Sequence, residues 1–174
     1  NAGCDTSRGP RETEDGTVEL VAAAGGIGVN PCVDVRAYTA LSADTVTGGA
    51  ANILSDSIGN ATGGLMDAGG GDITLDSTGD IDGGADDATA DINGDTVTLV
   101  AAVGGIGVNT ILDVTSVTAL NADTVAGDDA NIVIDSLGNV NVGDVDASAG
   151  TVTRASTGHL DRVTDDATAD INAA

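Results

Sequence analysis

A long internal repeat constrains the fold of this chain more than any other feature. Residues 17–29 read TVELVAAAGGIGV and residues 96–108 read TVTLVAAVGGIGV, so each position of the first copy aligns with the one numbered 79 higher. The alignment holds without a gap to the end of the chain, and 46 of the 79 aligned pairs are identical. No polar or Pro-rich linker separates the two copies, so we expect one continuous stack of repeats rather than separate beads.

A shorter period lies inside the long one. Residues 53–59 (ILSDSIG) resemble residues 73–79 (ITLDSTG), and residues 132–138 and 152–158 repeat this pattern at the same spacing in the second copy. Dividing each copy by four gives coils of similar size. The sequence therefore predicts an all-β, right-handed parallel β-helix (β-solenoid) of about eight coils of roughly 20 residues each. At about 4.8 Å per coil, the rod would be roughly 40 Å long.

The apolar residues also favour stacked strands. Val18, Leu20 and Ala22 alternate with more polar positions, as in a strand with one buried face. The chain has no Trp or Phe, Tyr38 is its one aromatic residue, and 26 Gly supply corners. Two tandem β-sandwich modules, one for each copy, are the alternative, but a sandwich core usually depends on large aromatic side chains.

The copies define the expected organisation. We expect an N-terminal extension or cap over residues 1–15, repeat copy 1 over 16–94 and repeat copy 2 over 95–174. Asp170–Asn172 closes the second copy at the phase where Gly16–Val18 begins the first. An unpaired coil edge invites strand pairing, so head-to-tail stacking into a homopolymer is expected. The alternatives are a fragment of one very long chain and a monomeric rod that residues 1–15 cap.

The charge is strongly negative, and it restricts the partners. The formal net charge is −23, from 28 acids against five arginines and no lysine. Such a field repels nucleic acid and anionic lipid and attracts cations, and no apolar run is long enough to span a membrane. Because oxygen-rich turns suit Ca²⁺, a calcium site is the leading ligand hypothesis, against diffuse screening of a solvated surface. Its candidate ligands are Asp72, Asp76, Asp80, Asp82, Asp86, Asp87, Asp165 and Asp166.

Two covalent features are also expected. Cys4 and Cys32 can form one disulfide in an oxidising compartment, or they can be unrelated thiols. Asn60-Ala61-Thr62 is an N-glycosylation sequon, which the second copy lacks.

Catalytic chemistry has little basis in the sequence. His159 is the sole histidine and aligns with Asp80, so no Ser-His or Cys-His arrangement recurs. A zinc site lacks a ligand set. Polysaccharide cleavage needs acids with a basic group in one cleft, yet Arg36, Arg154 and Arg162 are isolated. No enzymatic activity is expected.

The phrases GGIGV at residues 25–29 and 104–108, and GGDITLDSTGDI at 70–81, resemble the repeats of filamentous-haemagglutinin-like, β-strand-repeat bacterial surface proteins. The resemblance covers residues 16–174. It implies a parallel β-helix, secretion to the cell surface or the extracellular space, and a stalk or adhesive role.

Three functions follow as expectations. The first is a non-enzymatic extracellular structural protein, either the subunit of a self-assembling surface filament or a segment of a fibrous stalk. The second is an adhesin that binds a surface or a glycan. The third is a calcium-stabilised component of a matrix or surface layer.

Overall fold

A computed structural model of the 174-residue chain describes residues 11–12, 17–22, 25–28, 33–36, 40–45, 51–125, 130–162 and 171–173. These residues contain no helix and form 15 strands. The strands are β1 (Arg11–Glu12), β2 (Thr17–Val21), β3 (Val33–Arg36), β4 (Ala40–Asp44), β5 (Ile53–Ile58), β6 (Ala61–Asp67), β7 (Ile73–Ser77), β8 (Ile81–Asp82), β9 (Ile92–Ala101), β10 (Leu112–Thr124), β11 (Ile132–Ser136), β12 (Val140–Asp146), β13 (Val152–Ser156), β14 (Leu160–Arg162) and β15 (Ile171–Asn172).

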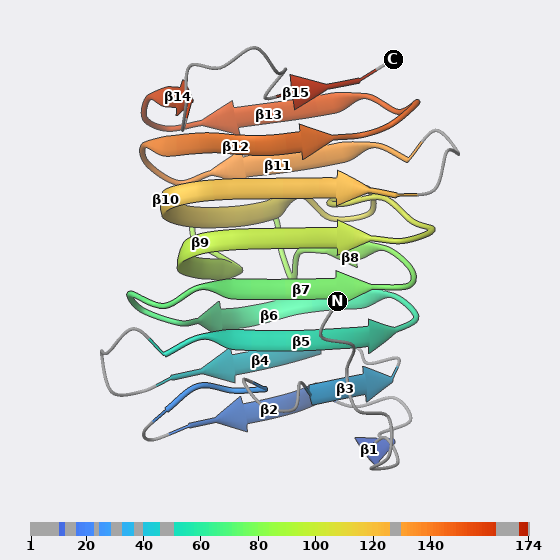
Figure 1. Ribbon diagram of the computed structural model, residues 1–174, viewed down its shortest axis with the longest axis vertical. Helices are drawn as coiled ribbons and strands as arrows, with labels where there is room; N and C mark the ends of the chain where they lie inside the picture. The colour runs from blue at the N-terminus through green and yellow to red at the C-terminus, as the bar shows by residue number, and fades with distance from the viewer. Residues whose placement is uncertain are drawn as a thin grey trace.

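The strands stack into a parallel β-solenoid with two walls (Figure 1). The front wall in that view contains β3, β5, β7, the C-terminal part of β9, the C-terminal part of β10, and β12. The rear wall contains β2, β4, β6, the N-terminal parts of β9 and β10, β11 and β13. Strands β9 and β10 therefore bend around a corner and belong to both walls.

Strand direction decides between the two folds expected from the sequence. Every strand pair among the described residues is parallel, for example Ile53 with Ile73 on the front wall and Ile132 with Val152 on the rear wall. This arrangement confirms the parallel solenoid and rules out tandem antiparallel sandwiches for the described part.

The expected count of eight coils is not confirmed. The body from residue 51 to 162, apart from 126–129, winds through about five turns. The difference in residue number between stacked partners is not constant: Ile53 lies on Ile73, Ile73 on Val97, and Met66 on Ile92. Coil length varies from turn to turn because the corner segments differ in length, which a short repeat within the strands does not reveal.

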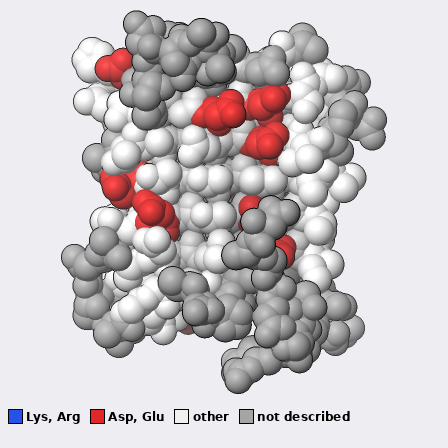
Figure 2. Space-filling view, in the orientation of Figure 1, with Lys and Arg blue, Asp and Glu red and all other residues white. Residues whose placement is uncertain are grey.

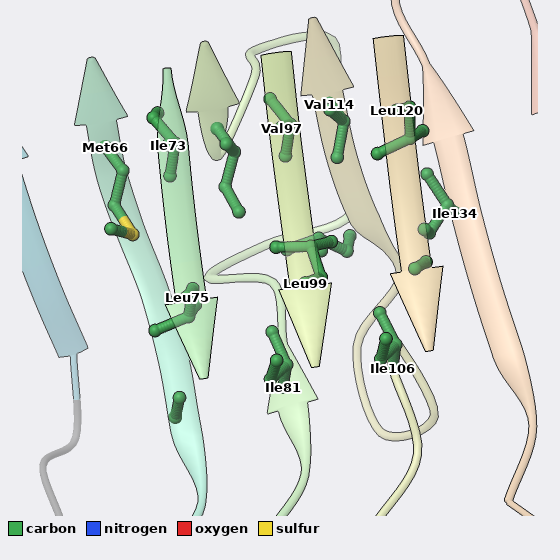
Figure 3. Packing of buried hydrophobic residues seen from close by; sticks show 14 of the residues in the cluster. Met66, Ile73, Leu75, Ile81, Val97, Leu99, Ile106, Val114, Leu120 and Ile134 are labelled. Carbon is green, nitrogen blue, oxygen red and sulfur yellow. The ribbon is translucent and has the colours of Figure 1, made fainter. Parts of the chain in front are cut away.

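Apolar ladders fill the space between the walls. On the front wall Ile53, Ile73, Val97, Leu120 and Val142 lie in register on successive strands, and all are buried. Figure 3 shows the aliphatic side chains of both walls meeting in this interior. The predicted alternation is confirmed in β9, where the inward side chains are fully buried and the outward ones are partly exposed.

The repeated GGIGV motif extends the apolar ladder of each wall at a corner. Ile106 is fully buried and bridges Ile81 below and Ile132 above, and Ile27 bridges Ile53 in the same way. The glycine after each of these isoleucines has a positive φ, +67° at Gly28 and +68° at Gly107. A Cβ at Gly107 would also collide with the Val133 carbonyl oxygen. The motif therefore places one isoleucine inward on a backbone that only glycine adopts easily.

Asparagines at corners tie each coil to the next. The Oδ1 atom of Asn52 accepts a hydrogen bond from the Asp72 backbone N–H at 3.0 Å, and Asn131, its copy, accepts one from the Thr151 N–H at 2.9 Å. Asn60 and its copy Asn139 do the same one corner later, at 3.1 and 2.9 Å. These side chains satisfy backbone donors where the strand ladder is interrupted.

The two repeat copies occupy opposite walls. Strand β5 lies on the front wall, whereas its copy β11 lies on the rear wall (Figure 1). Likewise β6 is on the rear wall and its copy β12 is on the front. One repeat therefore corresponds to an odd number of half-turns, and two repeats correspond to a whole number of turns. The boundary between the copies, at residues 94 and 95, falls inside β9.

The ladder predicts a large difference between two leucines. Leu99→Ala should lower the free energy of unfolding by about 2–5 kcal/mol, because Leu99 is fully buried and its loss leaves a cavity. Leu65→Ala is the matched control, since Leu65 is 48% exposed, and its cost should stay below about 1 kcal/mol. Urea unfolding followed by circular dichroism measures both. Equal costs would contradict the described interior.

Candidate functional site

A column of three carboxylates is the most unusual polar feature of the described residues. Asp91, Asp113 and Asp135 precede or lie within strands that pair in register, so they lie one above another on the rear wall. Asp113 is fully buried and Asp91 is 8% exposed. We call these three residues the aspartate column. Carboxylates on adjacent strands lie about 4.8 Å apart, where like charges repel.

Backbone donors hold part of the column. Asp91 accepts hydrogen bonds from the N–H groups of Gly84 and Asp113, both at 3.0 Å. The Oδ2 atom of Asp113 accepts one from the Asp87 N–H at 3.2 Å. The segment between β8 and β9 therefore closes over Asp113 and removes it from water.

Two oxygens of the column lack a donor. The Oδ1 atoms of Asp113 and Asp135 are buried and have no hydrogen-bond partner within the described residues. An unsatisfied buried acceptor costs about 1–3 kcal/mol, and more when it is charged. A proton on one carboxyl group, or a cation between the two, would satisfy both atoms.

The surroundings favour the protonated form. Burial raises the pKa of Asp113, and the carboxylates of Asp91, Asp135 and Asp86 raise it further, against the lowering effect of the Asp87 N–H. Burial also raises the pKa of Asp91. This column can therefore take up protons or cations.

Smaller carboxylate groups occur elsewhere on the surface. Asp56 and Asp76 are register partners on the front wall. Although Asp76 is exposed, its partial desolvation, followed by repulsion from Asp56, raises its pKa. Partial desolvation, followed by repulsion from Asp146 and Asp144, raises the pKa of Asp123. Figure 2 shows acidic groups gathered in a few small clusters on one face.

Several of the predicted calcium ligands serve as acceptors for the next coil. Asp72 accepts from the Thr96 N–H at 3.2 Å, Asp80 from the Gly105 N–H at 2.9 Å, and Asp82 from the Asn109 N–H at 2.9 Å. Asp87 caps its own turn by accepting from the Thr89 N–H at 2.6 Å.

The structure does not bring the predicted calcium ligands together as a metal centre. Asp76 and Asp86 are exposed, and Asp165 and Asp166 lie outside the described residues. Within the described part, no three His, Cys, Asp or Glu side chains are grouped to hold a metal ion. Specific calcium binding stays a prediction.

The remaining predicted sites are only partly visible. Cys4 and Cys32 lie outside the described residues, so their pairing stays a prediction. Asn60 is exposed, and its amide donates to Asp80 at 3.2 Å while its Oδ1 caps the corner. Its glycosylation stays a prediction. His159 is exposed at the equivalent corner of the second copy, where its N–H donates to Asn139.

A shallow hollow of about 120 Å³ is lined by Asn52, Ile53, Leu54, Asp72 and Thr74. Pockets that enclose small organic ligands are usually about 300–1,000 Å³. No helix in the described segments could cross a membrane.

Sequence reasoning missed the aspartate column. Asp113 matches Asp34 in the first copy and Asp135 matches Asp56, and this retention within the repeat was the available signal. What the repeat does not show is the cover over Asp113, which comes from the corner segment that contains Asp87.

Comparisons with known proteins identify no relative. No family model, curated protein or solved structure matches this chain.

The aspartate column predicts that acid stabilises the fold. The folded-state pKa of Asp113 is raised, so the folded protein holds this proton to a higher pH than the unfolded chain does. Stability should be full below the unfolded pKa and should fall as the pH rises through the folded pKa. The melting temperature should therefore increase as the pH is lowered from 7 towards that range.

Asp113→Asn tests the cause. The substitution should raise the free energy of unfolding at pH 7 by about 1 kcal/mol, because it removes a buried charge and supplies a donor beside Asp135. It should also flatten the pH dependence of the melting temperature. Glu19→Gln, at an exposed position outside the column, is the control and should change neither. A destabilised Asp113→Asn protein with unchanged pH dependence would show that Asp113 is held ionised by an unseen partner.

Proposed function

We propose that the protein is a non-enzymatic extracellular structural element, the subunit of a self-assembling surface filament or a segment of a fibrous stalk. The observation that carries this proposal is the continuity of the stack across the repeat boundary. Strand β9 contains the end of one copy and the start of the next, and its Val97, Leu99 and Ala101 are fully buried against β7 and β10.

Such continuity suits a load-bearing rod. Each coil uses its backbone hydrogen bonds to hold the coils above and below, and the corner asparagines add side-chain bonds along the same axis. The same units can extend a stack without a new type of interface, because repeats contact only their neighbours. The polar groups of the corners are largely used for this purpose, which leaves little arranged chemistry for catalysis.

The carboxylate columns support a second candidate, a calcium-stabilised matrix or surface-layer component. Register-paired acids such as Asp56 with Asp76, and Asp113 with Asp135, bring like charges together on adjacent coils. Divalent cations would relieve this repulsion, whether they bind at fixed sites or only screen the surface. Adhesion to a glycan or surface is the remaining alternative.

Electron microscopy of the purified protein at high concentration, with calcium and with chelator, tests the filament. We expect uniform fibres whose X-ray diffraction shows a meridional reflection near ~4.8 Å, the spacing of coils stacked along the fibre axis. Loss of the fibres in chelator, with recovery in calcium but not in magnesium, would support the calcium-stabilised form. Dispersed short rods under all conditions would contradict the filament, and glycan binding by those rods would favour the adhesin.

A further inference from the structure

We propose that a second copy of this chain stacks on β13, with its own β2 pairing parallel to β13 in the register that β9 uses on β7. This inference rests on the proposed filament and specifies its junction. The partner is the same protein, and the contact joins the end of one molecule to the beginning of the next.

The molecule already contains this junction once. Strand β7 belongs to the first repeat, and it pairs with the start of the second repeat in β9, with Ile73 opposite Val97 and Ser77 opposite Ala101. Strand β13 is the copy of β7, and β2 is the copy of this part of β9. Carrying the register over from one copy to the other places Val152 opposite Val18 of a second molecule.

Burial at the two ends matches a copy of this junction that is unfilled on the rear wall. On the front wall β1 pairs with β3, with Arg11 opposite Val35, in the place that β15 of a stacked molecule would take, so stacking requires β1 to leave that edge. Ile81 and Ile92 are fully buried, whereas their copies Leu160 and Ile171 are 53% and 49% exposed. At the other end, Val97 and Leu99 are fully buried, whereas Val18 and Leu20 are only partly buried. Each end therefore presents apolar positions whose copies are covered inside the molecule.

The two ends of the molecule can stack on each other because their strands lie on the same wall. One repeat moves a strand to the opposite wall, so two repeats return it to the same wall. Accordingly β2 and β13 both lie on the rear wall (Figure 1). A second copy can stack by translation along the axis without a half-turn, which gives an open, head-to-tail contact between identical subunits.

One residue of the proposed junction differs from its counterpart in the internal junction and determines how strongly the two molecules associate. Arg154 stands where the first copy has Leu75, opposite Ile134 in the inward register. Its Nη2 donates to the Ser136 hydroxyl at 3.2 Å, while Nε and Nη1 have no hydrogen-bond partner among the described residues. Nε and Nη1 are already buried in the single molecule. In the stacked pair Arg154 would face Leu20, so a charged side chain replaces the leucine that faces Leu99 in the internal junction, and covering the rest of the guanidinium is costly. The junction between molecules is therefore weaker than the one inside each molecule, and it is reversible.

A cysteine pair tests the register. In a background with Cys4→Ser and Cys32→Ser, the double variant Thr153→Cys/Glu19→Cys places two outward cysteines opposite each other across the junction. Stacked strands put their Cα atoms about 4.8 Å apart, within disulfide range. The control Thr153→Cys/Val21→Cys moves one partner further along the strand, to roughly 8 Å, which is beyond that range.

The expected result is a ladder of covalent oligomers on oxidation of the first pair and little or none from the control. Equal cross-linking of both pairs, or cross-linking of the control alone, would overturn the register. If the wild-type protein forms fibres while the first pair stays monomeric, this junction is wrong but the filament stands. If the wild-type protein stays monomeric at every concentration and neither pair cross-links, both proposals fail.

Arg154→Leu tests the strength of the junction. The substitution restores the side chain of the internal junction, so it should tighten self-association at least about tenfold in sedimentation velocity, the equivalent of about 1.4 kcal/mol. Leu20→Asp should abolish association of either protein, with circular dichroism confirming that the coils remain folded. Weaker association of Arg154→Leu would show that Arg154 binds the partner, and it would overturn this account of the junction.

Discussion

The parallel pairing of coils is the constraint on which the rest of this structure depends. Because successive coils are held about 4.8 Å apart by backbone hydrogen bonds, each side chain has as its nearest neighbour the residue at the same position one coil away. Aliphatic residues stacked in this way make continuous ladders such as Ile73, Val97 and Leu120. Asparagines at corners make ladders of hydrogen bonds. Aspartates stacked in the same way repel one another. The geometry that stabilises the interior therefore also brings like charges close together.

The sequence predicts those parts of the architecture that depend on residues close together along the chain. The inward alternation in 96–101 and the glycine corner at 104–108 depend on a few consecutive residues, and both were found. The predicted number of coils is not confirmed, because the length of each coil depends on how far its corner segment extends before the chain returns to its wall. The burial of Asp113 depends on Asp87, which lies in an earlier corner segment, and on a register that no short motif encodes.

The acidic composition and the stacked fold are compatible for a physical reason. Several acids that looked like metal ligands, among them Asp72 and Asp80, use their carboxylates to hold backbone N–H groups of the next coil. They act as corner caps and stay at the surface, where water and salt screen them. The aspartate column is different, because two of its carboxylate oxygens are buried and lack donors. Its response to protons and cations is therefore distinct from that of the surface as a whole.

Because the two repeats occupy opposite walls, surface features that both copies share lie on opposite sides of the molecule. A surface sequence retained in both copies, such as the corner at Asn60 and Asn139, is presented once in each direction away from the axis. Anything that recognises such a sequence meets it on both sides of one molecule, half a rotation apart. Two binding events at such positions would therefore occur on opposite faces of one molecule, where the effective concentration of the second site rather than one strong contact decides how tightly both are held.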